Sequence, residues 1–266
     1  MEKIKKALER AKETQGVTNK SNKLIQENQI GQLSYIKYTK TRVLKVSKTI
    51  LENKKVIVGD SNGVISDQYK VLRTQVLHRL KSNQWNSLII TSPTEGCGKT
   101  LTSINLAISL AREVNHSVLL VDLDLRRPCI HKYFYEDKNL GISDYLIKNY
   151  DLDEILFNPG FERLVVLPGN ESVSNSSETL SSPKMVSLVN ELKSRYPNRI
   201  VIFDMPPLLS CDDVIAFKPY VDSIMLVIEE GRTTKEELIR SHNLLENEKI
   251  IGTVLNKACI KEQAYS

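Results

Sequence analysis

The sequence of 266 residues contains no apolar run near 18 residues, the length that a membrane-spanning helix needs. Its first 15 residues, MEKIKKALERAKETQ, have no apolar stretch of the kind found in secretory signals. We therefore expect no transmembrane segment and a cytoplasmic protein. A hydrophobic share of 41% still allows a sizeable core, and 26% charged residues are ordinary for a soluble domain.

Cysteine is also scarce, with four residues and no C-x-x-C pair, and the four histidines are scattered. This pattern argues against a disulfide framework or a structural metal site, and it favours reduced, mostly buried thiols. No internal repeat is present.

Positive charge is concentrated at the N-terminus, although the whole chain carries a net charge of only +5. Residues 1–50 hold 12 Lys and Arg against 4 Asp and Glu, which leaves 25 against 28 for the remainder. An amphipathic helix is predicted over residues 1–15, and a linker over 16–34. Such a basic segment could contact an anionic membrane surface, nucleic acid or an acidic partner, or it could be a solvated tail. No recognisable nucleic-acid module is present, so no specific nucleic acid is expected.

Continuous apolar runs alternate with helical segments from about residue 66 onward. Such runs are typical of strands in a parallel sheet that is covered on both faces. The spacing predicts an α/β fold with a doubly wound, mostly parallel sheet flanked by helices. The predicted strands are Ser87–Thr91, Ser117–Val121, Arg163–Leu167, Arg199–Phe203, Ser223–Ile228 and Lys249–Leu255, with a further short one at Val56–Val58. Helices are predicted near residues 66–81, 100–113, 141–156, 183–195, 211–219 and 232–246.

The stretch TSPTEGCGKTLTS at residues 91–103 joins a predicted strand to a predicted helix, the context in which Gly-Lys-Thr indicates a phosphate-binding loop. Glycine lets backbone N–H groups approach phosphate oxygens, and the helix N-terminus adds partial positive charge. Lys99 is expected to reach the outer phosphates, and Thr100 to offer its hydroxyl to Mg²⁺. The full motif has a further glycine where this chain has Pro93, so a plain glycine-rich turn is the alternative.

Three aspartates stand at the ends of later predicted strands. Asp122 and Asp124 lie in VLLVDLDLRRP, and Asp204 lies in RIVIFDMPP. Ligands of open α/β sheets bind at the carboxyl ends of the strands, so these side chains are expected to share a crevice with the loop. Asp204 suits a Mg²⁺ ligand, and Asp122 a second metal anchor or a base. One such aspartate could simply cap a helix, but the set predicts a nucleoside triphosphate site with Mg²⁺.

These motifs resemble those of the cytosolic bacterial tyrosine autokinases (BY-kinases) of exopolysaccharide export, which share a broad class with the ParA and MinD ATPases. The resemblance rests on TSPTEGCGKT, LLVDLDLRRP and VIFDMPPLLSCDDV, and also on SDQYKVLRTQV, PYVDSIMLVIEEGRTT and IIGTVLN. MEKIKKALERA and LPGNESVSNSSETLSSPKM are similar to the branch found beside exosortase-type polysaccharide loci. The similarity covers residues 56–256 and, more loosely, the N-terminal segment.

The resemblance implies three parts: a basic N-terminal segment and linker (1–55), a P-loop kinase domain (56–256) and a C-terminal tail (257–266). It implies an ATP-dependent protein-tyrosine kinase in which Asp122 or Asp124 assists the attacking hydroxyl. The implied catalytic residues are Lys99, Asp122, Asp124 and Asp204. The implied ATP-binding residues are Glu95, Gly96, Cys97, Gly98, Lys99, Thr100 and Leu101, and the implied Mg²⁺ ligands are Thr100, Asp122 and Asp204.

The resemblance also implies partners. A separate membrane chain-length regulator of polysaccharide synthesis would activate the kinase at the inner face of the membrane, and a phosphatase would reverse its action. Homo-oligomers of the family form through E-x-x-R-x-x-R, which reads Asp67, Lys70 and Arg73 here, so an ordinary amphipathic helix is the alternative. The family's C-terminal tyrosine cluster is reduced to Tyr265, the implied phosphoacceptor.

Two positions leave alternatives open. ParA and MinD relatives carry a lysine where this chain has Thr94, which argues against their ATPase mechanism, although a nucleotide-gated regulator without efficient tyrosine phosphorylation stays the second hypothesis. Cys97 is either a small residue whose side chain points aside or a redox-sensitive thiol, because a helix N-terminus and a neighbouring lysine would lower its pKa.

Overall fold

The computed structural model describes residues 41–58, 63–136, 139–196, 198–246 and 249–259. The helix predicted over residues 1–15, the predicted linker and Tyr265 lie outside these ranges. No helix within them is long and apolar enough to cross a membrane.

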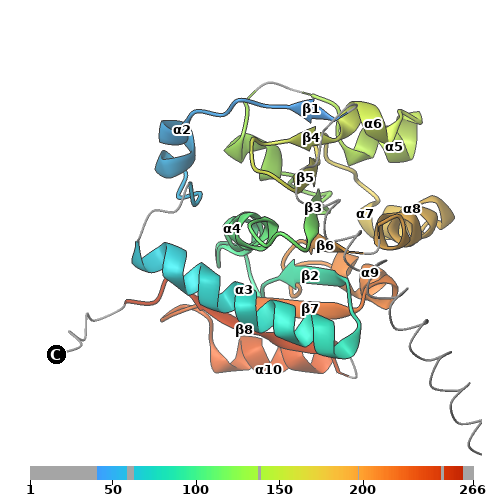
Figure 1. Cartoon of the computed structure of the whole chain (residues 1–266). Coiled ribbons are helices and arrows are strands. Elements are labelled where there is room, and N and C mark those ends of the chain that lie inside the picture. Colours follow the sequence, from blue (N-terminus) through green and yellow to red (C-terminus); the bar gives the residue numbers. More distant parts are fainter. Residues whose placement is uncertain (1–40, 59–62, 137–138, 197, 247–248, 260–266) are drawn as a thin grey trace, which may run out of the picture. The chain divides into compact units, whose positions relative to one another are not determined.

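A single sheet of eight strands organises the described residues, in the order β1-β4-β5-β3-β6-β2-β7-β8 (Figure 1). Neighbouring strands are parallel, except that β4 and β5 pair in antiparallel fashion. The predicted doubly wound, mostly parallel sheet is confirmed. The strands are β1 (Arg42–Val43), β2 (Ser87–Thr91), β3 (Ser117–Asp122), β4 (Phe157–Asn158), β5 (Leu164–Leu167), β6 (Arg199–Asp204), β7 (Ser223–Glu229) and β8 (Ile250–Asn256).

Helices cover both faces of the sheet and create two apolar cores. One core joins α3 and α4 to the sheet through residues such as Leu80, Ile104 and Leu88. The other joins α8 and α9 to the opposite face through Met185, Phe217 and Phe203. The helices are α2 (Lys48–Asn53), α3 (Val64–Asn83), α4 (Lys99–Ala111), α5 (Ile142–Lys148), α6 (Leu152–Ile155), α7 (Ser176–Leu180), α8 (Pro183–Ser194), α9 (Asp213–Phe217) and α10 (Lys235–Leu244), with 3-10 turns η1 (Ile130–Tyr133) and η2 (Lys218–Tyr220).

Helix α4 is buried on nearly all sides, because it lies between the sheet and α3. The run Ile104–Ala111 is mostly apolar, and its two polar residues, Asn105 and Ser109, are buried and form hydrogen bonds, which suits a helix enclosed in this way. The enclosure fixes the N-terminal turn of α4 at the carboxyl ends of β2, β3 and β6.

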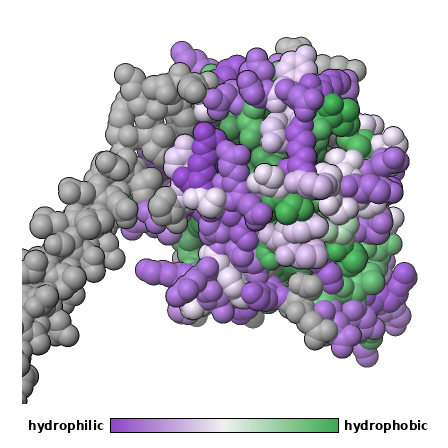
Figure 2. Space-filling model, turned by 90° about the vertical axis from the view of Figure 1, so that its right-hand side faces the viewer, coloured by the Kyte–Doolittle hydropathy of each residue, from purple (hydrophilic) through white to green (hydrophobic). Residues whose placement is uncertain are grey.

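On the side that carries α5, α6 and α8, Figure 2 shows mostly hydrophilic side chains, with hydrophobic ones in separate patches.

Residues 41–58 pack as part of the folded unit, although the sequence suggested a boundary at residue 55. Strand β1 pairs with β4, and Leu51 and Val56 are buried in the core beside α4. The strand predicted at Val56–Val58 is not formed. Asn105 instead accepts a hydrogen bond from the Ile57 amide at 2.9 Å and donates one to the carbonyl of the preceding Lys55, while the Val56 amide donates to the Leu51 carbonyl.

Two predicted helices are shorter than expected. The helix predicted over residues 141–156 is divided into α5 and α6, because Asn149 adopts a left-handed conformation with φ of 59°. The helix predicted over 211–219 ends as α9 and continues as a 3-10 turn at Pro219, which has no N–H to donate.

Candidate nucleotide and phosphotransfer site

The phosphate loop between β2 and α4 adopts a conformation that requires glycine. Gly96 and Gly98 have φ of 83° and 90°, in the left-handed region that other residues rarely adopt. A Cβ atom on Gly96 would lie 2.6 Å from Nη1 of Arg232, and one on Gly98 would collide with the side chain of Asn256. Glycine at these two positions therefore permits the left-handed backbone of the turn and also the close packing of Arg232 and Asn256 against it. The departure at Pro93 leaves the loop intact.

Asn256 supports the loop from the end of β8, a role that the sequence analysis missed. Its Nδ2 atom donates a hydrogen bond to the carbonyl oxygen of Cys97 at 2.8 Å. The available signal was a polar residue directly after the apolar run IIGTVL, at the same edge of the sheet as the loop.

Lys99 forms ion pairs with two of the predicted aspartates. Its Nζ atom lies 2.9 Å from Oδ2 of Asp124 and 3.8 Å from Oδ2 of Asp204. Burial alone lowers the pKa of Lys99, but the charges of Asp204 and Asp124 outweigh it and raise that pKa above its usual value. The ammonium group is thus charged and turned toward the carboxylates.

Asp204 is fully buried beneath α4 and accepts two hydroxyl hydrogen bonds. Thr100 donates to Oδ2 at 2.7 Å, and Ser103 donates to Oδ1 at 2.9 Å. Burial raises the pKa of Asp204, while Lys99 and the two hydroxyls lower it less strongly. Ser103 was not singled out from the sequence, but its position four residues after Lys99 puts both residues on the same helix face.

Asp122 is also fully buried, and it pairs in register with Asp204 on the neighbouring strand. Its Oδ2 atom accepts hydrogen bonds from the amides of Cys129 and Ile130, both at 2.9 Å, whereas Oδ1 has no partner among the described residues. Burial, together with the charge of Asp204, raises the pKa of Asp122 to about 7. A buried carboxylate oxygen without a partner suits a bound cation.

The oxygen atoms around this point suit Mg²⁺. They are the hydroxyl of Thr100 and the carboxylates of Asp122 and Asp204, and Mg²⁺ prefers hard oxygen ligands. No group of three or more His, Cys, Asp or Glu in the described ranges forms a complete metal cage. Mg²⁺ at a nucleotide site does not need one, because phosphate oxygens and water supply most of its ligands.

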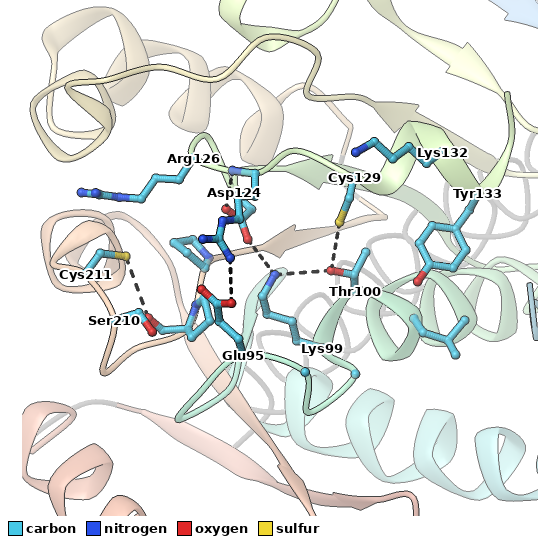
Figure 3. A pocket seen from close by; sticks show the side chains of 16 residues that line it. Glu95, Lys99, Thr100, Asp124, Arg126, Cys129, Lys132, Tyr133, Ser210 and Cys211 are labelled. Carbon is cyan, nitrogen blue, oxygen red and sulfur yellow. Dashed lines mark hydrogen bonds and ion pairs between the residues drawn. The ribbon is translucent and has the colours of Figure 1, made fainter. Parts of the chain in front are cut away.

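A cavity of about 610 Å³ opens beside the loop (Figure 3). Its walls come from the phosphate loop, from the segment after β3 and from the segment after β6. The lining residues are Glu95, Gly96, Gly98, Lys99, Thr100, Leu101, Asp124, Arg126, Arg127, Cys129, Lys132, Tyr133, Pro206, Pro207, Ser210 and Cys211. The structure therefore brings Asp124 and all the predicted loop residues except Cys97 to one cavity. Asp204 and Asp122 are buried next to it, in hydrogen bonds with the lining residues Thr100 and Cys129.

Other predicted site residues lie elsewhere or face away. Cys97 is fully buried, and its sulfur lies 3.8 Å from the hydroxyl of Thr94 rather than in the cavity, which favours the structural alternative. On α3, Lys70 pairs with Asp67 at 2.8 Å. Arg73 pairs with Glu113 at 3.0 Å and donates to the Ser109 carbonyl. These three side chains thus have partners within the chain.

The fold and the site together define a class of protein. A glycine-dependent loop between a parallel strand and a buried helix, with a lysine, a hydroxyl and carboxylates at the strand ends, is the arrangement of P-loop nucleotide-binding proteins.

Comparison with known proteins narrows the class. Residues 86–255 match the AAA domain family. The chain is 31% identical to tyrosine-protein kinase YwqD of Bacillus subtilis over 79% of this chain and 89% of that protein. It is 29% identical to the putative tyrosine-protein kinase CapB of Staphylococcus aureus over 76% and 88%. The kinase domain of the Escherichia coli tyrosine kinase ETK superposes with a TM-score of 0.69 at 26% identity, over 85% and 92%. The chain belongs to the family of bacterial tyrosine-protein kinases within the P-loop class.

Proposed function

We propose that this chain is an ATP-dependent protein-tyrosine kinase that phosphorylates itself and regulates exopolysaccharide synthesis or export. The observation that carries the proposal is the position of Asp124, which faces the same cavity as the phosphate loop and is bound to Lys99. The reaction joins a tyrosine oxygen to the γ-phosphorus of ATP and breaks the bond from that phosphorus to ADP. The phenol proton passes to a carboxylate and then to water.

Lys99 changes partners during this cycle. Without nucleotide its ammonium group is held by Asp124 and Asp204, and with nucleotide it turns to the outer phosphates. The backbone N–H groups from Glu95 to Leu101 supply further donors at the N-terminus of α4. The exchange keeps Lys99 paired in both states, so its charge is never buried alone.

Mg²⁺, when bound, neutralises phosphate charge and orients the γ-phosphoryl group. Thr100, Asp122 and Asp204 are the residues that would hold it. Asp122 would contribute the oxygen that has no hydrogen-bond partner among the described residues, and its two backbone donors fix the carboxylate in place.

Asp124 is the better candidate of the two carboxylates for the acceptor hydroxyl. It lines the cavity, whereas Asp122 is buried next to it. The Arg127 amide holds Oδ1 of Asp124 at 3.0 Å, and departure of Lys99 would leave Oδ2 free to accept the phenol proton. A nearby carboxylate is needed because a free phenol has a pKa near 10.

The proposed setting is the inner face of the cytoplasmic membrane, reached through a partner. That partner is a membrane chain-length regulator on a separate chain, which activates the kinase. A homo-oligomer and a phosphatase that removes the phosphate complete the proposal, and Tyr265 is the proposed acceptor in the tail.

The second candidate is a ParA- or MinD-like ATPase that acts as a nucleotide-gated regulator. Its support is weaker. MinD of Pyrococcus horikoshii complexed with Mg-ADP superposes with a TM-score of 0.53 at 21% identity, over 64% of this chain and 69% of that one, which reflects the shared fold. Thr94 also stands where that class carries its additional lysine.

Radiolabelled ATP separates the two candidates. The kinase predicts transfer of the γ-phosphate to tyrosine in the protein, with transfer lost in Asp124→Asn while that variant still binds Mg-ATP. Label found only as free phosphate, in the same amount in Asp124→Asn, would favour the ATPase.

A further inference from the structure

Different elements bound the phosphate loop on its two flanks. On the flank toward β7 and β8, Arg232 and Asn256 lie against Gly96 and Gly98. The other walls come from the segments that follow β3 and β6. A group that takes phosphate from a nucleotide on the loop would therefore approach past the segments that follow β3 and β6.

The charged side chains along this entrance are mainly basic. Arg126, Arg127 and Lys132 all line the cavity from the segment after β3, and Figure 3 draws Arg126 and Lys132 above Lys99, toward the left and the right of the view. The carboxylates that line the cavity, Glu95 and Asp124, belong to the phosphate loop and the reaction centre.

The three cationic side chains differ in the strength of their ion pairs within the chain. Arg126 binds buried Asp213 through two nitrogen atoms, at 3.2 and 3.1 Å, so its charge is compensated within the chain. Arg127 pairs with Glu95 at 2.7 Å, but the two side chains are 75% and 59% exposed, and a pair in water is weak enough to exchange partners.

Lys132 has the fewest such interactions of the three within the described ranges. Its side chain is exposed and forms no ion pair within the described ranges. Its backbone is nevertheless anchored, because its carbonyl oxygen accepts a hydrogen bond from Nζ of Lys54 at 2.5 Å. Lys132 thus presents, from a fixed point at the entrance, a positive charge that no described ion pair neutralises.

We propose that Arg127 and Lys132 select the acceptor, and that the preferred substrate is a tyrosine flanked by acidic residues. This inference rests on the proposed kinase function and names its substrate class. The phenol ring would pass between Tyr133 and the prolines Pro206 and Pro207, which form the less polar part of the lining. Flanking carboxylates would then meet the two cations, while flanking lysines would be repelled.

Peptide binding tests the inference without requiring turnover. The probes are peptides with one tyrosine, flanked by glutamate in one and by lysine in the other, added to the full chain with Mg-ADP. Their dissociation constants are measured by fluorescence anisotropy at low and high salt. We expect the glutamate peptide to bind about tenfold more tightly at low salt, with a smaller ratio at high salt.

Variants assign the preference to particular residues. The double variant Arg127→Glu, Lys132→Glu should lose or invert the preference. Lys81→Glu is the control, because it makes the same kind of charge change far from the cavity. Lys81 is exposed in the last turn of α3, near the amino end of β2, so this variant should keep the preference. Nucleotide affinity is measured in each variant.

Several results would overturn the inference. They are equal affinity for the two peptides, no binding of either peptide, or an unchanged preference in the double variant. A loss of nucleotide affinity as large as the loss of discrimination would assign the cations to the nucleotide instead. Phosphate transfer is followed in parallel. A preference for the acidic peptide without any phosphotyrosine would support acidic recognition while contradicting the kinase function.

Discussion

At the scale of single residues, the main feature of the site is two buried carboxylates, whose charged form is disfavoured because it is removed from water. Asp122 and Asp204 are adjacent across β3 and β6 and have no exposure to solvent. Lys99 and Thr100 offset part of this cost at Asp204. One oxygen of Asp122 has no partner in the described part of the chain and burial raises the pKa of this group to about 7, so the nucleotide-free site can exchange a proton for a cation.

Asp122 predicts how stability depends on pH. The folded protein keeps a proton on Asp122 that the unfolded chain releases, because the pKa of this group rises from 3.8 to about 7 on folding. Its contribution to stability therefore falls as pH rises from about 4 to about 7, and is level above that. Asp122→Asn should remove this slope. One pKa unit corresponds to about 1.4 kcal/mol, and 1 kcal/mol moves the Tm of such a domain by about 2 to 4 °C.

The measurement is the Tm of nucleotide-free protein across this pH range. Asp67→Asn, on exposed α3, is the matched control and should keep the wild-type slope. An identical slope in wild type and Asp122→Asn would mean that the buried carboxylate does not hold the proton.

At the scale of elements, the phosphate loop is shaped by its glycines and by the strand that supports it. Gly98→Ala would place a methyl group against Asn256 at a φ of 90°. Strain of this kind costs about 1 to 3 kcal/mol, so we expect ATP affinity to fall by at least about fivefold in titration calorimetry. Gly63→Ala adds the same methyl group where nothing lies within 4 Å, and should bind ATP normally. Equal affinities would refute the conformation given for the loop.

Helix α3 is held to α4 by the side chain of Arg73. Arg73 is 18% exposed and holds the Ser109 carbonyl and Glu113, both in or next to α4. Arg73→Ala should lower the free energy of unfolding by about 1 to 2 kcal/mol, because these groups lose a partner. Lys70→Ala breaks only an exposed pair and should cost less than about 0.5 kcal/mol.

Urea unfolding measures both variants. If oligomerisation is the main role of Arg73, its variant would keep the stability of the subunit and change only the molecular mass in light scattering.

The sequence predicted the elements whose signals are local. Continuous apolar runs identified β2, β3, β5, β6, β7 and β8, and Gly-Lys-Thr identified the turn between β2 and α4. It did not predict β1 and β4, which have two residues each and depend on pairing with distant strands. It also missed Asn256, because this residue is 159 positions from the carbonyl that it supports. Site residues within one motif can therefore be predicted from the sequence. Residues that hydrogen-bond to the motif from a distant strand, such as Asn256, cannot.

At the scale of the whole molecule, the domain begins earlier than the motifs suggest. Residues 41–58 supply β1, α2 and the buried side chains of Leu51 and Val56. Deletion of residues 1–58 should lower stability by more than about 3 kcal/mol, since large apolar side chains leave the core. Deletion of residues 1–37 removes none of these elements or side chains and should leave the Tm nearly unchanged.

Thermal unfolding compares these deletions with the full chain. Equal Tm values for the two deletions would mean that residues 38–58 contribute nothing to the fold. Nucleotide affinity should follow the same order, because Asn105 on α4 connects this segment to the helix that carries Lys99.

Phosphotyrosine mapping by mass spectrometry, after incubation of the full chain with Mg-ATP, tests the central claim most directly. We expect phosphate on tyrosine, with Tyr265 as the proposed site, and none in Lys99→Met. Tyr265→Phe shows whether that residue is the acceptor among the ten tyrosines of the chain. The absence of phosphotyrosine in a protein that binds ATP, with the membrane partner's cytosolic segment added, would contradict the account and favour a nucleotide-gated regulator.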